Sequence, residues 1–539
     1  MGSKNFKKAE SVFFILITLF NLIPLISNKF FPTLDGAAHL YNANLIKQLI
    51  VDHNENLSHF FVFNTEPVPN WTGHFFLSFF NLFLPAFLAD KLLLLFYLIG
   101  LPFAFRSLIK TIAPESYLFS YFIFPFTYTF IFFLGFYNFC VGLVLLLLSI
   151  NYWIRHCKDS FTWKRTLMLF LLVSLTYFSH LFVFAVLVLL IGIQILTAAI
   201  ISPVKNAVSF SHSIQTALRQ STMILLASIL PITLMGYYFY SRQSGTPTFL
   251  SSAELTNWIK QIRPMISLNF QEEEPYTKKI YYLITCLFII AVFNKVNALW
   301  DSSKMTFQTR LRHLLKSIFQ LSDFWLFSAL LMLLLFFKLP DSTVSAGFVS
   351  VRLCLLFYLF MVIWLAAQDL PKWLGVLSLL ILFYCQFNLK TYYFSAAREL
   401  NKVAVECNEA SNFVPANSLV LPLNYSDNWL ESHFSNYLGI DKPMVILENY
   451  ECGNDYFPLK WNDRFVPNTL FGTIRSGELP CLNWKSNPQN KSQQIDCVFI
   501  LGNLDGRTDS CSNSIRKNLN DHYTLSYHSD YCRLYQIKK

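Results

Sequence analysis

The chain is organised by long apolar runs that alternate with short polar connections. Runs of about 17 to 25 apolar residues, the length that crosses a hydrocarbon core as an α-helix, recur from Ser11 to Leu389. The pattern predicts an α-helical polytopic membrane protein with about eleven transmembrane helices. The expected spans are 11–27, 88–105, 117–134, 137–154, 166–179, 181–201, 221–240, 280–293, 323–339, 353–367 and 371–389.

Composition agrees with this pattern. The chain is 54% hydrophobic and 14% charged, with a mean hydropathy of +0.41. A soluble protein has nearer 25% charged residues, so these values exclude a soluble globular fold. The net charge of +10 is not gathered into a basic patch with interleaved aromatics. We therefore expect the lipid bilayer as a partner, and no nucleic acid.

The distribution of Lys and Arg orients the spans. If the amino terminus is cytoplasmic and the spans alternate, the basic residues gather on the cytoplasmic side, which is the positive-inside asymmetry. The tight turns on the other side, near residues 135 and 180, contain neither. An odd number of spans then places the carboxyl third in an extracytoplasmic or periplasmic position. We expect an integral plasma (inner) membrane protein. The basic residues on the cytoplasmic side include Lys4, Lys7, Lys8, Arg106, Lys110, Arg155, Lys158, Lys164, Arg165, Lys205, Arg219, Lys295, Lys304, Arg310, Arg312 and Lys316.

The first outer connection, 28–87, is long and contains a second apolar stretch. This stretch, Trp71 to Phe87, is interrupted by polar residues and by Pro85. If it crossed the membrane, every later connection would change sides and the Lys and Arg asymmetry would invert. We therefore expect an interfacial or re-entrant helix here.

The composition changes sharply near residue 394, so we expect two domains. Residues 1–393 form the polytopic transmembrane domain, and 394–539 form an extracytoplasmic soluble domain. Short β-rich runs at 418–423, 444–447 and 497–501 alternate with polar stretches, which predicts a mixed α/β fold.

The carboxyl domain also contains an even set of cysteines. Such a set is compatible with three disulfides, which form in an oxidising compartment. The alternative is that the thiols are unpaired core residues. The six cysteines are Cys407, Cys452, Cys481, Cys497, Cys511 and Cys532.

Polar groups that could carry chemistry gather on the outer side. In a helix from 35 to 50, Asp35, His39 and Asn42 fall at i, i+4 and i+7 and share one face. His74 lies in the same outer connection, and His180 lies at a tight outer turn. Asp35 is the candidate general base, with His39 beside it, and the other three are candidate pocket residues. Asp35 is also a good helix N-cap, and the histidines are equally suited to structural hydrogen bonds.

Three cations on the outer side are candidates for binding an anionic headgroup. Arg352 stands at the outer start of a span, and Lys260 and Arg263 lie in the outer connection 241–279. Arg binds phosphate through paired hydrogen bonds, although Arg352 could instead extend to the interface beside its helix. Asp35, His39 and His74 could in principle hold a divalent metal, but their spacing is not diagnostic. We therefore expect no cofactor.

The layout resembles the GT-C superfamily of membrane glycosyltransferases, which includes protein O-mannosyltransferases and the aminoarabinose transferases of lipid A. The resemblance depends on the stretch Thr33–Leu40, on Pro69–His74 leading a helix, and on the Gly-Phe segment that precedes Arg352. It covers roughly residues 1–390. The Asp-Glu pair and the Pro-Pro step common in that family are absent from this chain.

The resemblance implies an inverting hexosyl- or pentosyltransferase. The donor would be a polyprenyl-phosphate-linked sugar, and the acceptor a hydroxyl of a glycan, lipid or protein outside the cytoplasm. Asp35 would be the general base, and Arg352, Arg263 or Lys260 would hold the departing phosphate. A transporter or flippase of lipid-linked saccharides is the alternative. It predicts polar residues at mid-membrane depth, broken helices and paired repeats. The sequence has no internal repeat, and its expected spans are almost free of charged residues in their middle parts.

Overall fold

The structure is a computed structural model that describes residues 2–159, 162–206, 209–241, 246–300, 320–343, 347–462, 464 and 495–538. It confirms a helical polytopic membrane fold with a sheet in the carboxyl region. Contacts divide the chain into two compact units, each built from separated segments. Unit 1 comprises Met1–Asn21, Tyr97–Phe132 and Phe139–Tyr392, and unit 2 comprises Leu22–Phe96, Phe133–Asn138 and Tyr393–Lys539.

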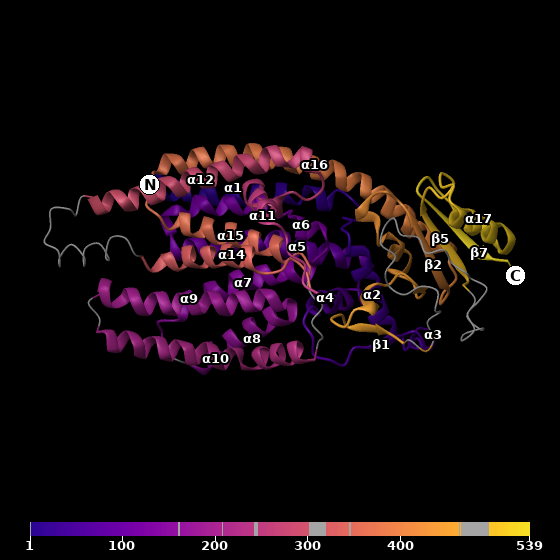
Figure 1. The fold of residues 1–539 in the computed structure, drawn as a ribbon, viewed down its shortest axis with the longest axis horizontal. Helices are drawn as coiled ribbons and strands as arrows, with labels where there is room; N and C mark the ends of the chain where they lie inside the picture. The colour runs from indigo at the N-terminus through magenta and orange to yellow at the C-terminus, as the bar shows by residue number, and fades with distance from the viewer. Residues whose placement is uncertain are drawn as a thin grey trace. The chain divides into compact units, whose positions relative to one another are not determined.

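The regular elements of unit 1 in the described residues are helices, and one isolated antiparallel bridge joins Thr248 to Ser342. Within it α9, α10, α14 and α15 run lengthwise beside one another (Figure 1). Three long helices have more than one turn in each unit: α1 (Gly2–Ile26), α5 (Ala86–Ile112) and α16 (Lys372–Ala410). The other elements are η1 (Pro114–Phe126), α6 (Phe130–Phe133), α7 (Tyr137–His156), α8 (Trp163–Ser179), α9 (Leu181–Asn206), α10 (Phe210–Tyr240), α11 (Ser252–Gln261), η2 (Arg263–Met265), α12 (Phe270–Trp300), η4 (Leu321–Asp323), α14 (Phe324–Lys338) and α15 (Val349–Ala366). The boundary between the units also cuts off the last residue of α6 and the first two residues of α7.

Within the described ranges, nine helices are long and apolar enough to cross a membrane. They coincide with nine of the eleven expected spans. The expected span 166–179 is the 17-residue α8, slightly shorter than the others. The span expected at 117–134 is wrong as an α-helix, because a 3₁₀ helix of 13 residues ends there at Phe126 and the four-residue α6 follows. Pro125 cannot donate the hydrogen bond that an α-helix needs at that point.

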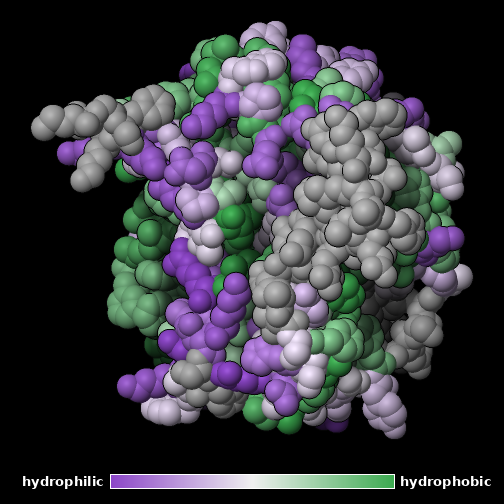
Figure 2. Space-filling view, turned by 90° about the vertical axis from the view of Figure 1, so that its left-hand side faces the viewer, coloured by the Kyte–Doolittle hydropathy of each residue, from purple (hydrophilic) through white to green (hydrophobic). Residues whose placement is uncertain are grey.

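Large apolar side chains lie on the outside of unit 1, which is the reverse of a soluble protein. Large apolar side chains such as Leu196 and Ile200 are about two-thirds exposed on α9, at 65% and 68%. By contrast, α15 is buried along almost its whole length. Apolar side chains facing outward along a long helix are suited to lipid contact. Figure 2, which looks at the end of the molecule where the N-terminus lies, shows hydrophilic side chains among the hydrophobic ones.

Unit 2 combines the first outer connection with the carboxyl region. Strand β1 of the first pairs antiparallel with β4 of the second. This grouping differs from the expected division into 1–393 and 394–539, because Leu22–Phe96 belongs with the carboxyl region. The elements of the first part are α2 (Gly36–Ile50), α3 (Glu55–Ser58), β1 (Phe61–Phe63) and α4 (Thr72–Phe80). With nine residues, α4 is too short to span a bilayer, as expected for Trp71–Phe87.

The carboxyl region is built on a five-stranded mixed sheet with strand order β3-β2-β5-β7-β6. Strand β2 is parallel to β3 and β5, whereas β7 is antiparallel to β5 and β6. The three expected β-rich runs are strands β2, β3 and β5, while β6, β7 and α17 were not predicted. The elements are η5 (Ser411–Phe413), β2 (Leu419–Tyr425), η6 (Trp429–Glu431), η7 (Phe434–Gly439), β3 (Val445–Ile446), η8 (Glu451–Gly453), β4 (Leu459–Trp461), β5 (Cys497–Gly502), α17 (Ser510–His522), β6 (Tyr523–His528) and β7 (Cys532–Ile537).

Among the cysteines that it describes in the carboxyl region, the structure forms none of the three expected disulfides, and the Cys511 side chain is half-buried. Four of the six cysteines, Cys407, Cys452, Cys497 and Cys532, carry free thiols and are buried in the core of the carboxyl region. Cysteine packs well as a small apolar side chain, which is the alternative stated above. Cys481 lies outside the described residues.

Tyr41 joins α2 to the sheet of unit 2. Its side chain is fully buried, and its hydroxyl donates to the Met444 carbonyl at 2.8 Å while accepting from the Ile446 amide at 3.0 Å. We expect Tyr41→Phe to destabilise the protein by about 1–3 kcal/mol, because both backbone groups lose their partner in a buried position. Thermal unfolding of the purified protein measures this. Tyr535→Phe, on a strand that this hydroxyl does not contact, is the control.

Candidate functional site

The candidate site lies entirely within unit 2 and begins where α2 begins. Residues 133–138 form a turn that holds the start of this helix. The amides of Leu34 and Asp35 donate to the carbonyls of Phe133 and Leu134 at 2.9 and 3.2 Å. Gly135 has a φ of +80°, and a Cβ at this residue would lie 2.8 Å from the Asp35 nitrogen. The close approach of the turn to Asp35 therefore requires glycine.

Asp35 occupies the N-cap position of α2, but its carboxylate does not cap the helix. Its side chain makes no cap hydrogen bond and is 11% exposed. Oδ1 instead faces Nε2 of His433 at 3.7 Å. The Tyr450 hydroxyl is near enough to interact with the carboxylate, although it does not reach hydrogen-bonding geometry. Burial raises the pKa of Asp35, and His433 partly offsets that rise. The Asp35 side chain therefore does not cap α2, contrary to the alternative interpretation of this residue.

His433 connects Asp35 to a second carboxylate. Its Nδ1 is hydrogen-bonded to Glu448, and its ring stacks on Tyr450 with centroids 4.4 Å apart. Glu448 also accepts from Ser435 at 3.1 Å and from the Asn436 amide at 2.6 Å. Because an ionised carboxylate only accepts, Glu448 fixes Nδ1 of His433 as a donor. Burial opposes the charged ring, but Glu448 and Asp35 outweigh it and raise the pKa of His433.

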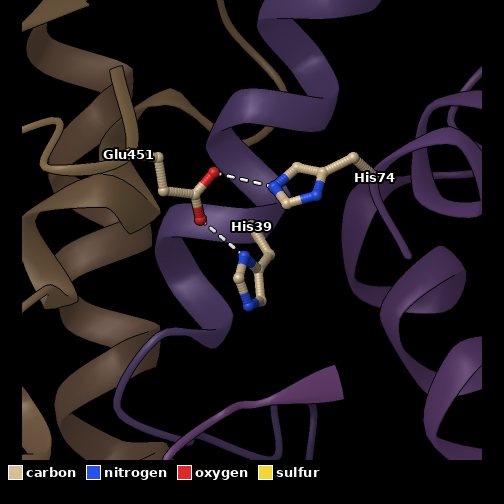
Figure 3. A group of neighbouring side chains, drawn as sticks. All are labelled: His39, His74 and Glu451. Carbon is tan, nitrogen blue, oxygen red and sulfur yellow. Dashed lines mark hydrogen bonds and ion pairs between the residues drawn. The ribbon is translucent and has the colours of Figure 1, made fainter. Parts of the chain in front are cut away.

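A second group lies beside this one and joins three elements (Figure 3). His39 of α2 and His74 of α4 both point at Glu451 of η8. Nδ1 of His39 is 2.5 Å from Oε1, and Nε2 of His74 is 2.7 Å from Oε2. The two rings meet edge to face with centroids 4.9 Å apart. All three side chains are buried, so the carboxylate has an imidazole partner for each oxygen.

Hydrogen-bond geometry indicates the charge of His39. Its other nitrogen, Nε2, lies 2.9 Å from the Gly135 carbonyl, which can only accept. With an ionised Glu451 on Nδ1, both nitrogens must donate, so the ring is an imidazolium. Burial works against this charge, but Glu451 raises the pKa of His39 to about 9. Burial likewise opposes ionisation of Glu451, yet His74 and His39 lower its pKa to about 2.

Asn42 links α2 to the segment before η8 through side-chain hydrogen bonds. Its side chain and that of Asn449 exchange two hydrogen bonds, at 3.0 and 2.9 Å, and its Nδ2 also donates to the Ala38 carbonyl. Asn42 thus shares the face of His39, as the helical spacing predicted. Its amide is occupied by protein partners, so it positions the site rather than lining a free pocket.

The other predicted site residues belong to unit 1. His180 and Arg352 both contact Phe139: the His180 ring centroid lies 5.3 Å from the Phe139 ring, and the guanidinium carbon of Arg352 lies 5.5 Å from it. Burial and the nearby Arg352 lower the pKa of His180. Arg263 is stacked on Phe130 at 4.1 Å and donates to a backbone carbonyl.

Lys260 is exposed in the last turn of α11. Of the eight predicted site residues, unit 2 therefore brings together Asp35, His39, Asn42 and His74. The residues that complete the site were not predicted: Tyr450, His433, Glu448 and Glu451.

No protein-family model and no curated protein sequence matches the chain.

Proposed function

We propose that the protein is an integral-membrane glycosyltransferase that moves a hexosyl or pentosyl group from a polyprenyl-phosphate donor to an acceptor hydroxyl on the outer face of the membrane. Asp35 acts as the general base. The observation that carries this proposal is the state of its carboxylate: it is buried, it does not cap its helix, and it faces His433. A carboxylate kept in such a place without a capping role is suited to proton transfer.

The chemistry needs one base and no acid. Asp35 removes the proton of the acceptor hydroxyl as its oxygen attacks the anomeric carbon of the sugar. The bond from that carbon to the phosphate oxygen breaks, and polyprenyl phosphate leaves as an anion with the bonding electron pair, so the anomeric configuration inverts. The proton on Asp35 is then released to solvent through His433, which Glu448 holds with Nε2 toward Asp35.

The departing phosphate requires a positive environment. Within unit 2, the imidazolium of His39 supplies positive charge, and His433 becomes positively charged when it takes the proton from Asp35. Arg352 and Lys260 belong to unit 1, and a role for them in binding phosphate stays a prediction from the sequence. Arg263 is less suited, because its guanidinium is already engaged with aromatic rings and with the Ile266 carbonyl.

The test uses the purified protein in liposomes with a polyprenyl-phosphate donor labelled in its sugar. We expect label to pass to an acceptor supplied as a mixed glycan and lipid extract, with release of polyprenyl phosphate. A flippase would instead move the intact donor between leaflets without breaking its phosphate–sugar bond. Label that crosses the bilayer but stays on the polyprenyl carrier, in the presence of every acceptor fraction, contradicts the proposal.

A further inference from the structure

We propose that His39, His74 and Glu451 form a binding site for a divalent transition-metal ion, with Zn²⁺ as its first candidate. The inference does not rest on the transferase proposal, but an ion would replace the proton that His39 carries on Nδ1. Two imidazole nitrogens and one carboxylate oxygen are a donor set that Zn²⁺ binds well, and three protein ligands are the number found in open zinc sites. The same donor set also binds Fe²⁺.

The donor atoms already converge. His39 Nδ1, His74 Nε2 and one carboxylate oxygen of Glu451 all lie within 4.8 Å of one another. Around a tetrahedral ion with bonds of about 2.0–2.1 Å, neighbouring donor atoms are about 3.4 Å apart. The present hydrogen-bonded distances of 2.5 and 2.7 Å therefore open by less than about 1 Å when an ion enters.

The surroundings of His39 are those of a metal-binding histidine. Its remote nitrogen, Nε2, donates to the Gly135 carbonyl at 2.9 Å. Metal-bound histidines almost always give their second N–H to a carbonyl or carboxylate, which fixes the ring and aims the other nitrogen at the ion. The positive φ of Gly135 holds that carbonyl in place. Here the aimed nitrogen is Nδ1, the one that faces Glu451 and His74.

The position of the site in the chain suggests what an ion would do. Glu451 is 412 residues from His39 and 377 from His74. An ion bound by all three would cross-link α2 and α4 of the first outer connection to η8 of the carboxyl region. Binding that exists only in the folded state stabilises that state by mass action. The ion would therefore stabilise the contact between the segments of unit 2 that position Asp35 and His433.

The test measures metal content rather than activity. The full chain is purified in detergent through a tag free of histidine, stripped with a chelator, dialysed against Zn²⁺ and analysed by mass spectrometry of the metal. We expect about one zinc ion per chain, and a lower melting temperature after stripping that Zn²⁺ restores. Co²⁺ in place of Zn²⁺ gives a visible spectrum that reports nitrogen and oxygen ligands.

Matched variants locate the ion. The double variant His39→Gln, His74→Gln is expected to lower the zinc affinity at least about tenfold. His522→Gln, His528→Gln, which removes two exposed histidines of the same unit, keeps it. If the first variant does not fold, Glu451→Gln preserves the shape of the site and tests the same point. Asp35→Asn, which we expect to lose transfer, retains the ion, so the two proposals fail separately.

Two results overturn the site. One is less than about 0.1 ion per chain in the folded wild-type protein, where a three-ligand site predicts about one, after dialysis against Zn²⁺, Fe²⁺ and Mn²⁺ in turn. The other is a zinc content that the ligand variants leave unchanged while the thermal shift persists. Binding of Fe²⁺ or Mn²⁺ in place of Zn²⁺, with the same dependence on His39, His74 and Glu451, supports the site and identifies its ion.

Discussion

Replacing Asp35 with asparagine is expected to slow sugar transfer by about 10²- to 10⁴-fold, the usual contribution of a general base. Asparagine has the shape of aspartate but cannot accept the acceptor's proton. Stability should change little, because the Asp35 side chain makes no cap hydrogen bond that the substitution would remove. A catalytic role therefore predicts a large loss of rate with an intact fold, whereas a capping role predicts the reverse.

The measurement is the single-turnover rate of sugar release from the labelled donor in liposomes, with folding monitored by thermal unfolding. Asp455→Asn is the matched control, since that carboxylate also belongs to unit 2 but is 74% exposed and faces Lys460. His433→Gln should lower the rate by less than Asp35→Asn, because it removes the proposed proton relay and leaves the base. A folded Asp35→Asn protein that transfers sugar at the wild-type rate rules out the general base.

The sequence allowed one half of the site to be predicted, and the reason is local geometry. Asp35, His39 and Asn42 are close in the chain, and helical periodicity alone places them on one face. Their contacts with the segment from Asn449 to Glu451 confirm that face. The membrane-spanning helices were predictable for a similar reason, since a continuous apolar run is itself the signal.

The other half could not be derived in this way. His433, Glu448 and Glu451 reach the site through tertiary packing across nearly 400 residues, and no periodicity connects them to α2. One signal was present. Glu448 and Glu451 lie in the short segment after β3, which ends at Ile446 and is parallel to its neighbour. Polar residues after the carboxyl ends of parallel strands often form sites. This signal can be recognised only when β3 is known to pair with β2. The sequence alone does not reveal that pairing.

Two other differences between the sequence predictions and the structure concern the segment 117–134 and the cysteines. The segment 117–134 has the apolar composition of a membrane helix, but Pro125 and the turn at 133–138 prevent a continuous α-helix. The cysteines were assigned to disulfides because their number is even, whereas burial in the sheet core explains Cys407, Cys497 and Cys532 as apolar packing. Counting residues cannot separate these two roles. Only the packing of the strands does.

Removing the carboxylate of Glu451 is expected to produce the largest loss of stability in unit 2. Glu451→Ala leaves two histidines buried without their partner, since the side chains of His39 and His74 are only 6% and 1% exposed. Breaking a buried ion pair from one side costs about 3–5 kcal/mol. Because about 1.4 kcal/mol corresponds to a factor of ten, hydrogen exchange of the amides of α2 should accelerate by about two to four orders of magnitude.

An exposed ion pair of the same length provides the control. Glu399 and Lys402 lie 2.7 Å apart in α16, and their side chains are 61% and 48% exposed. The carboxylate–imidazole distance from Glu451 to His74 is also 2.7 Å, so the two pairs match in length. They differ in burial, in the cation, in the second imidazole and in joining one helix turn or distant segments. Solvent screens the exposed pair, and Glu399→Ala should cost less than about 1 kcal/mol and leave the exchange of α2 unchanged. If the two variants exchange alike in peptides covering 36–50, Glu451 does not hold α2 to the carboxyl region. A selective effect of Glu451→Ala on α2 and α4 would show that one buried carboxylate maintains the geometry from which Asp35 acts.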